Sequence, residues 1–354
     1  MTQQDLPSSP PSGRVSIIIK ALNEEKHIAR AIESSLAALE NIGGEVILAD
    51  SCSTDRTIEI ARNYPIKIVQ LANPDERCCG IGPQLGYQHS CCEFVYILDG
   101  DMYLRSGFLE QAISCMATHP ELAGVGGLVV EHNQDSLEYK SRVERAADHM
   151  KAGHVNRLDM GGLYRRQAIE QVGYLSDRNL HSYEEFDLAI RLRAAGWRLQ
   201  RLAVDAVDHH GHDIPPYALL KRRWKSKYIN GIGEVTRSAI GKAHFSLLGR
   251  ELRELYIYLA FLGWMSIGVA IVIGAAKTLS TFHTFLLFLV ISAMPPIALF
   301  MKKRSVEKAT YAYASLALHA AALIRGFFAK KHAPYGRISS TLIAHNEVAL
   351  ELEH

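Results

Sequence analysis

The 354-residue sequence has no marked excess of charge of either sign, because 39 Lys and Arg residues balance 37 Asp and Glu residues to a formal net charge of +2. This balance excludes nucleic acid as the main partner, since domains that bind nucleic acid carry a strongly basic face. The six cysteines lack the Cys-x2-Cys spacing of zinc sites, and we expect reduced thiols. No apolar stretch follows Met1, so we expect no cleaved signal peptide.

Charge is almost missing from one long stretch. Residues 255–301 contain one charged residue, Lys277, in 47 positions. Within this stretch lie two apolar runs, 255–276 and 279–301, and each exceeds the roughly 20 helical residues that cross a bilayer core. A third apolar run, 309–328, is interrupted by His319 and Arg325 and could either span or lie in the interface. We therefore predict two or three transmembrane helices within 255–328.

Basic residues flank the apolar runs and predict their orientation. Arg250 and Arg253 precede the first run, and residues 302–304 are all basic. By the positive-inside rule, the N-terminal domain is cytoplasmic and the protein is a multi-pass protein of the inner (cytoplasmic) membrane. Residues 216–254 hold nine basic and three acidic residues, which predicts an amphipathic segment at the membrane interface, on anionic lipids.

The two ends of the chain carry no pattern of a packed fold. Residues 1–13 are polar and proline-rich, and we expect a disordered tail. Residues 329–354 are expected to form a C-terminal tail. Its last residues, Leu352 to His354, resemble the start of a vector-encoded histidine tag and are left out of the fold prediction.

The N-terminal two-thirds alternates short β-branched runs with helical stretches. Strands are expected at 15–19, 45–49, 66–71 and 94–98. This alternation predicts an α/β fold with an open, Rossmann-like, mostly parallel sheet, in which ligands bind beyond the carboxyl ends of the strands. The polar residues that follow three of these strands are Asn23, Glu24, Asp50, Asp99 and Asp101.

Asp99-Gly100-Asp101 is the central feature of this edge. Two carboxylates after a buried strand suit a hard cation, Mn²⁺ or Mg²⁺, with substrate phosphates as further ligands. Taken alone, the same pattern also describes a solvated turn.

Six motifs in this order resemble those of inverting family 2 glycosyltransferases of the exopolysaccharide type. They lie at 15–25, 49–57, 99–101, 161–166, 183–188 and 191–197, within a region of similarity over about 14–237. The resemblance implies a GT-A catalytic domain over 14–215, the fold of nucleotide-diphospho-sugar transferases, followed by a membrane anchor.

The resemblance also implies roles for individual residues. The donor would be a UDP- or GDP-linked sugar, and Asp101 would be a metal ligand with Asp99 beside it. Lys20 and Leu22 stand where the family often has proline and tyrosine. The residues implied to bind the substrates in this domain are Ala21, Asn23, Glu24, Asp50, Arg77, Asp99, Gly161 and Gly162.

Glu185 stands where the family has its catalytic aspartate. Such a transfer needs a general base for the acceptor hydroxyl, and Glu184 and Asp187 are competing candidates. The structural alternative is that all three only solvate a helix start, where acidic side chains interact favourably with the helix dipole.

Two clusters follow the catalytic motifs. In 208–213, the resemblance implies that a histidine can complete the metal shell, with His212 and His210 as the candidates, and the alternative is a solvated loop. In 221–224, Arg222 or Arg223 could bind the diphosphate and Trp224 could stack on the acceptor sugar. Leu220 replaces the glutamine of processive relatives, and the basic stretch could instead simply face the membrane.

These features predict transfer of a sugar from a nucleoside diphosphate sugar to a lipid-linked or glycan acceptor at the cytoplasmic face, with membrane lipids as partners. One alternative is a polyprenyl-phosphate glycosyltransferase resembling dolichol-phosphate mannose synthase. A second is a non-catalytic membrane scaffold with a degenerate transferase domain.

Overall fold

The computed structural model describes residues 14–133, 148–210 and 214–345. The predicted tail at 1–13 and the candidate ligand His212 lie outside these residues. The chain divides into two compact units. One comprises residues up to 214 together with those from 331 onward, and the other comprises 215–330.

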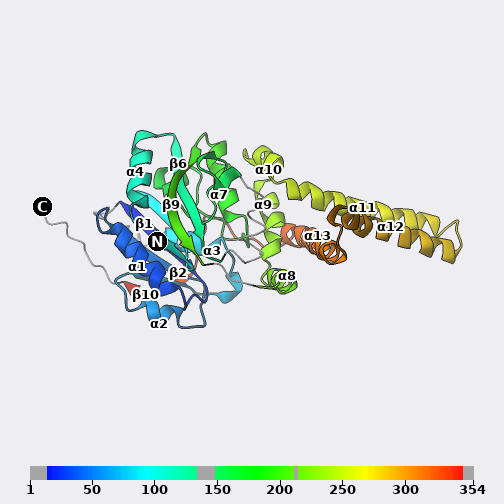
Figure 1. The fold of residues 1–354 in the computed structure, drawn as a ribbon, viewed down its shortest axis with the longest axis horizontal. Helices are drawn as coiled ribbons and strands as arrows, with labels where there is room; N and C mark the ends of the chain where they lie inside the picture. The colour runs from blue at the N-terminus through cyan, green and yellow to red at the C-terminus, as the bar shows by residue number, and fades with distance from the viewer. Residues whose placement is uncertain (1–13, 134–147, 211–213, 346–354) are drawn as a thin grey trace, which may run out of the picture. The chain divides into compact units, whose positions relative to one another are not determined.

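The first unit is built on a ten-stranded sheet with the order β10-β3-β2-β1-β4-β8-β6-β9-β5, and β7 pairs with β9 (Figure 1). β1 lies between β2 and β4 and is parallel to both, with Ala21 opposite Asp50 and Lys20 opposite Asp99. The strands are β1 Val15–Ala21, β2 Gly44–Asp50, β3 Lys67–Leu71, β4 Phe94–Asp99, β5 Met102–Leu104, β6 Leu122–Glu131, β7 Gly153–Val155, β8 Gly162–Arg165, β9 Arg198–His209 and β10 Ser340–His345.

Side chains alternate along β1 and contribute to a hydrophobic core on each face of the sheet. Ile17 and Ile19 pack with α1 and α4, whereas Ile18 packs with α3, α6 and α7. The helices of this unit are α1 Ile28–Leu39, α2 Thr57–Ala61, η1 Pro74–Glu76, α3 Ile81–Gln88, α4 Phe108–Thr118, η2 Asp148–Met150, α6 Arg166–Gln171 and α7 Glu184–Ala194. Helices on both faces confirm the predicted α/β class.

The strand directions follow the prediction in one half of the sheet. β3, β2, β1 and β4 are parallel, as the alternation of strand and helix requires. Beyond β4 the sheet is mixed, because β8 runs antiparallel to both β4 and β6. Parallel pairing continues between β6 and β9, so the second half of the sheet combines both strand directions.

The prediction of a simple tail at 329–354 is wrong for residues 332–345. β10 pairs antiparallel with β3 at the edge of the sheet, and Ile338 just before it is 1% exposed. The run Ser340 to Ala344 is short, apolar and partly β-branched, so the unpaired edge of β3 offers it a template for pairing.

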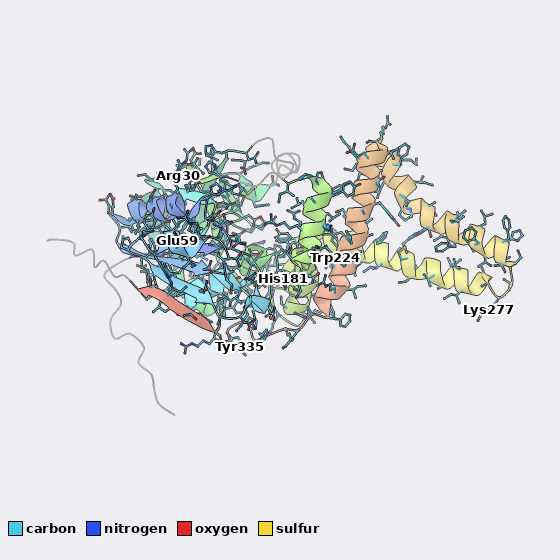
Figure 2. All side chains as sticks on the ribbon, turned by 90° about the horizontal axis from the view of Figure 1, so that it is seen from below. Arg30, Glu59, His181, Trp224, Lys277 and Tyr335 are labelled. Atoms are coloured by element: carbon cyan, nitrogen blue, oxygen red, sulfur yellow. The ribbon has the colours of Figure 1, made fainter. Side chains whose placement is uncertain are left out.

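The second unit is helical. Two 23-residue helices, α11 Arg253–Ala275 and α12 Thr281–Lys303, have hydropathies of 2.1 and 2.2, and their apolar windows are 6% and 0% buried. Both are long and apolar enough to cross a membrane, and Lys277 lies at the turn between them (Figure 2). The remaining elements are α8 Pro216–Lys225, η3 Tyr228–Asn230, α9 Gly231–Ala239, α10 Phe245–Glu251 and α13 Val306–Phe327.

Candidate functional site

The ends of β1 and β2 bring the first group of predicted residues together. Asn23 adopts a left-handed backbone conformation, and its side-chain oxygen accepts a hydrogen bond from Thr54 N at 2.8 Å. Glu24 N donates to Thr57 Oγ1 at 2.8 Å, and the Ala21 carbonyl accepts from Ser51 N. The turn after β1 is therefore fastened to the turn after β2, beside Asp50.

Asp50 is fully buried, and the hydrogen bonds within the described residues satisfy one of its two carboxylate oxygens. Its Oδ2 accepts hydrogen bonds from Ser53 N and Gln70 Nε2, both at 2.9 Å. Its Oδ1 is buried and has no hydrogen-bond partner within the described part of the chain. A buried acceptor without a donor is costly, and the N–H of a nucleotide base would satisfy it. Arg77 lies beside this turn, since its guanidinium donates to the Cys52 carbonyl at 2.7 Å.

Asp99 and Asp101 follow β4, and the structure adds a histidine to them. β5 pairs with β9 so that Met102 lies opposite His209, which brings His209 Nε2 to 3.6 Å from Asp101 Oδ2. On its other side, His209 Nδ1 lies 2.5 Å from Glu131 Oε2. Burial acts to lower the pKa of His209, but hydrogen bonds and charge from Asp101 and Glu131 raise it to about 9.

The candidate ligand His210 lies differently. Its ring stacks on that of His132 with 4.5 Å between centroids and packs against Tyr103 at 4.7 Å. Its backbone N–H, not its ring, contacts Asp101, donating to the Asp101 carbonyl. The histidine that the structure pairs with the Asp101 carboxylate is therefore His209, which the sequence motif contained but did not single out. Carboxylate oxygens fit Mn²⁺ or Mg²⁺, and a cation bound at Asp101 would have to replace the proton on His209 Nε2 for that nitrogen to be a ligand.

Lys20 is a second residue that sequence reasoning missed. Its Nζ lies 2.9 Å from Asp99 Oδ1 and 3.4 Å from Glu184 Oε1. Burial acts to lower the pKa of Lys20, but the Asp99 and Glu184 charges raise it well above its usual value, so the ammonium stays charged. In the sequence, Lys20 is the one charged residue in a strand of mostly apolar residues, and this could have marked it as a site residue.

Glu185 is the buried carboxylate of α7. Its Oε2 accepts a hydrogen bond from Met160 N at 3.3 Å. Burial raises the pKa of Glu185 to about 8; Lys20 acts to lower it, and the charges of Asp159, Glu184 and Asp99 raise it further. A carboxylate that titrates near neutral pH is suited to accept a proton as a general base.

Asp187, the other candidate base on α7, has one of its carboxylate oxygens in a buried ion pair. Its carboxylate is fully buried and its Oδ2 pairs with Arg191 Nε at 2.8 Å, one helical turn further along α7. The Arg191 guanidinium also donates to the carbonyls of Tyr174 and Leu175. This network fastens α7 to the preceding loop.

Gly161 and Gly162 lie over the end of β4, next to Met160. Gly161 has φ +98°, and a Cβ there would lie 2.9 Å from the Tyr96 hydroxyl. Gly162 begins β8 and pairs with Ile97. Only glycine allows the backbone to pass this closely beside Glu185 and the strand ends.

Arg222, Arg223 and Trp224 lie on α8, in the helical unit. Arg222 is exposed, Arg223 lies over the Tyr228 ring at 5.1 Å, and Arg325 lies over the Trp224 ring at 5.2 Å. Their roles toward diphosphate and acceptor stay predictions.

A separate group, Glu45, Cys91 and Cys92, places three potential ligand atoms within 4.8 Å of one another. We do not assign a metal here, because Glu45 already pairs with Lys67 at 2.9 Å. In addition, burial and the Glu45 carboxylate raise the pKa of Cys91 to about 12, which keeps that thiol protonated.

Comparison with known proteins agrees with this geometry. Residues 16–173 match the family model described as Glycosyl transferase family 2. The chain is 23% identical over 204 residues (52% of this chain) to the dolichyl N-acetyl-alpha-D-glucosaminyl phosphate 3-beta-D-2,3-diacetamido-2,3-dideoxy-beta-D-glucuronosyltransferase of Methanococcus voltae. It is 29% identical over 126 residues (33% of this chain) to the probable glucomannan 4-beta-mannosyltransferase 6 of Oryza sativa subsp. japonica. The matches span 63% and 21% of the lengths of these two relatives.

Among solved structures, the chain resembles the mannosyltransferase PcManGT from Pyrobaculum calidifontis in complex with GDP-Man and Mn²⁺. The TM-score is 0.55 at 19% identity, over 92% of this chain and 91% of that one. At this identity the likeness establishes a shared fold.

Proposed function

We propose that the protein is a membrane-associated inverting glycosyltransferase, because residues 16–173 match the model described as Glycosyl transferase family 2. It would move a sugar from a nucleoside diphosphate sugar to a lipid-linked glycan acceptor. The observation that carries the proposal is one edge of the sheet, where the unpartnered Asp50 oxygen, the Asp99–Asp101–His209 group and the buried Glu185 lie together.

The residues fit a single displacement. The acceptor hydroxyl oxygen forms a bond to the anomeric carbon while the bond from that carbon to the diphosphate oxygen breaks. Glu185 takes the hydroxyl proton, and the nucleoside diphosphate leaves with the bonding electrons. Asp99 and Asp101, with His209 beside Asp101, would hold a divalent cation, Mn²⁺ or Mg²⁺, which would supply positive charge for the leaving diphosphate.

The comparisons support the donor and acceptor classes without naming a substrate for this chain. The structural neighbour binds GDP-Man with Mn²⁺, and the M. voltae relative acts on a dolichyl-linked sugar. We infer a UDP- or GDP-linked donor. Because Glu185 is a buried base, we favour a sugar hydroxyl as the nucleophile over a polyprenyl phosphate, which is already ionised.

The path of the chain supports membrane insertion with two crossings. Residues 331–345 belong to the same unit as the sheet, and β10 is hydrogen-bonded to β3. A chain that leaves this unit at 214 and rejoins it at 331 crosses a bilayer an even number of times. Crossings by α11 and α12 meet this condition, and α13 then stays on the catalytic side. Basic residues at 302–304 make that side cytoplasmic in the inner membrane.

A donor screen tests the proposal. Purified protein in detergent is incubated with UDP-, GDP- and dTDP-sugars, a membrane lipid extract and Mn²⁺, and release of nucleoside diphosphate is measured. We expect turnover with a UDP- or GDP-sugar that depends on the lipid extract.

Asp101→Asn is expected to lower that turnover by about 100-fold or more. Asp205→Asn is the matched control, because Asp205 is half exposed and pairs with Arg105 at 3.0 Å on the same strand as His209. Equal turnover in the Asp101 variant and the wild type would contradict the assigned metal site. No release of nucleotide from any donor would contradict the proposed function.

A further inference from the structure

The segment after α13 is bound to the rest of the first unit by side-chain hydrogen bonds as well as by strand pairing. We call residues 332–345 the C-terminal strap. Asn179 binds the strap twice, donating to the His332 carbonyl and accepting from His332 N. Gln88 does the same, donating to the Gly336 carbonyl at 3.1 Å and accepting from Ile338 N at 2.9 Å. Paired side-chain contacts of this kind indicate a specific docking position.

Arg178 is the main side chain between the strap and the rest of the unit. Its guanidinium, 8% exposed, donates to the strap carbonyls of Gly336 and Arg337 and pairs with Glu76. Its own backbone carbonyl accepts from the Cys78 thiol at 3.0 Å. Arg178 therefore joins the strap to Glu76 through its guanidinium, and its backbone carbonyl holds Cys78.

Residues 76–78 contact the turn that follows Asp50. Arg77, between Glu76 and Cys78, donates to the Cys52 carbonyl in the turn that follows Asp50. A second route runs through the sheet, because β10 pairs with β3 and Gln70 of β3 donates to Asp50 Oδ2. The strap thus supports both the loop beside Asp50 and a hydrogen bond to Asp50 itself.

We propose that the C-terminal strap, through Arg178, is a positioning element of the nucleotide pocket, so that donor affinity depends on docking of the chain's C-terminal segment. This inference rests on the proposed function, because it takes Asp50 to face the donor base. If the strap leaves, two buried N–H contacts of Arg178 lose their acceptors, and Glu76 and Arg77 rearrange to compensate. The affected step is nucleotide binding, not proton transfer at Glu185.

Nucleotide titration tests the inference without turnover. The full chain, a chain ending at Lys331 and a chain ending at His345 are titrated calorimetrically with UDP and with GDP, each with Mn²⁺. We expect the Kd of the preferred nucleotide to rise about tenfold when the strap is missing and to stay within about twofold when only residues after His345 are removed. Adding a synthetic peptide of residues 332–345 should restore binding.

A point substitution covers the case in which the shortened chain does not fold. Arg178→Met should weaken nucleotide binding by a similar factor while kcat at saturating donor stays within about twofold. Arg166→Met is the matched control, because Arg166 also donates to backbone, at the Cys92 carbonyl, but near the start of β4. Wild-type nucleotide affinity in folded Arg178→Met protein would overturn the inference. A full chain that binds neither nucleotide would overturn the proposed function and this inference with it.

Discussion

At the scale of single residues, the burial of Glu185 has a consequence for pH. Its raised pKa, about 8, means that the carboxylate is mostly protonated at pH 6 and cannot accept a proton there. We expect kcat to rise with pH along a limb centred near 8, well above the usual range of a glutamate. The measurement is a pH profile of kcat at saturating donor and Mn²⁺.

The same shift predicts a linked effect on stability. Because the folded-state pKa of Glu185 lies above its unfolded value, its contribution to stability is full below about pH 4.5 and is lost as pH rises through about 8. Glu185→Gln should abolish most turnover and also remove this part of the pH dependence of Tm. A variant that loses activity but keeps the wild-type dependence of Tm on pH would show that Glu185 is not the titrating group.

Lys20 lends itself to a separate prediction. Its ammonium neutralises both Asp99 and Glu184, so Lys20→Met leaves two carboxylates without their cation beside Glu185. We expect kcat to fall by at least about tenfold, with partial recovery in Lys20→Arg. Lys67→Met is the control, because Lys67 also pairs with a carboxylate, Glu45, near the start of β2. A similar loss of kcat in both methionine variants would reduce the role of Lys20 to general stability.

The candidate site residues that the sequence points to follow strands that can be recognised as buried from their runs of apolar residues. Asp50 and Asp99 are of this kind. His209 was not singled out, because its place beside Asp101 depends on the register of β5 with β9, which no local pattern encodes. Asp187 resembles a site residue in the sequence, but its side chain turns inward to Arg191.

At the scale of elements, the parallel strands and the two apolar helices were the predictable parts. Their patterns are local, and each element carries its own hydrophobic signature. The pairing of β10 with β3 was not predictable, because its partner strand lies roughly 270 positions earlier in the chain and the run is only six residues long.

A glycine contact between two helices yields the prediction at this scale. A Cβ on Gly233 of α9 would lie 2.1 Å from the Leu323 carbonyl oxygen of α13, so the helices could not keep their spacing. Gly233→Ala should destabilise the helical unit by about 1–3 kcal/mol, seen as a lower Tm in detergent. Gly263→Ala is the control, because nothing lies within 4 Å of its Cβ position. Equal Tm values for both variants would mean that α9 and α13 pack less closely than described.

At the scale of the whole molecule, the average composition is the sum of charged surfaces and the apolar surfaces of two helices. The near-neutral total charge combines an acidic site at the sheet edge with basic helices and two apolar ones, whose apolar windows are 6% and 0% buried among the described residues. A core helix of similar composition would be mostly buried, and the proposed membrane insertion gives these two surfaces an apolar solvent.

Membrane topology is the prediction that tests this whole arrangement. Docking of the strap requires an even number of crossings, so the turn between α11 and α12 and the strap should lie on opposite faces of the membrane. In sealed right-side-out vesicles, a membrane-impermeant maleimide should label Lys277→Cys directly. It should label Tyr335→Cys, at a position that is 74% exposed, only after permeabilisation (Figure 2).

The native Cys91, which is exposed on the first unit, is the internal control for the side on which the strap lies. Cys91→Ser removes its background labelling. Labelling of Tyr335→Cys without permeabilisation would mean that α13 crosses the membrane, and pairing of β10 with β3 in the inserted protein would then be impossible.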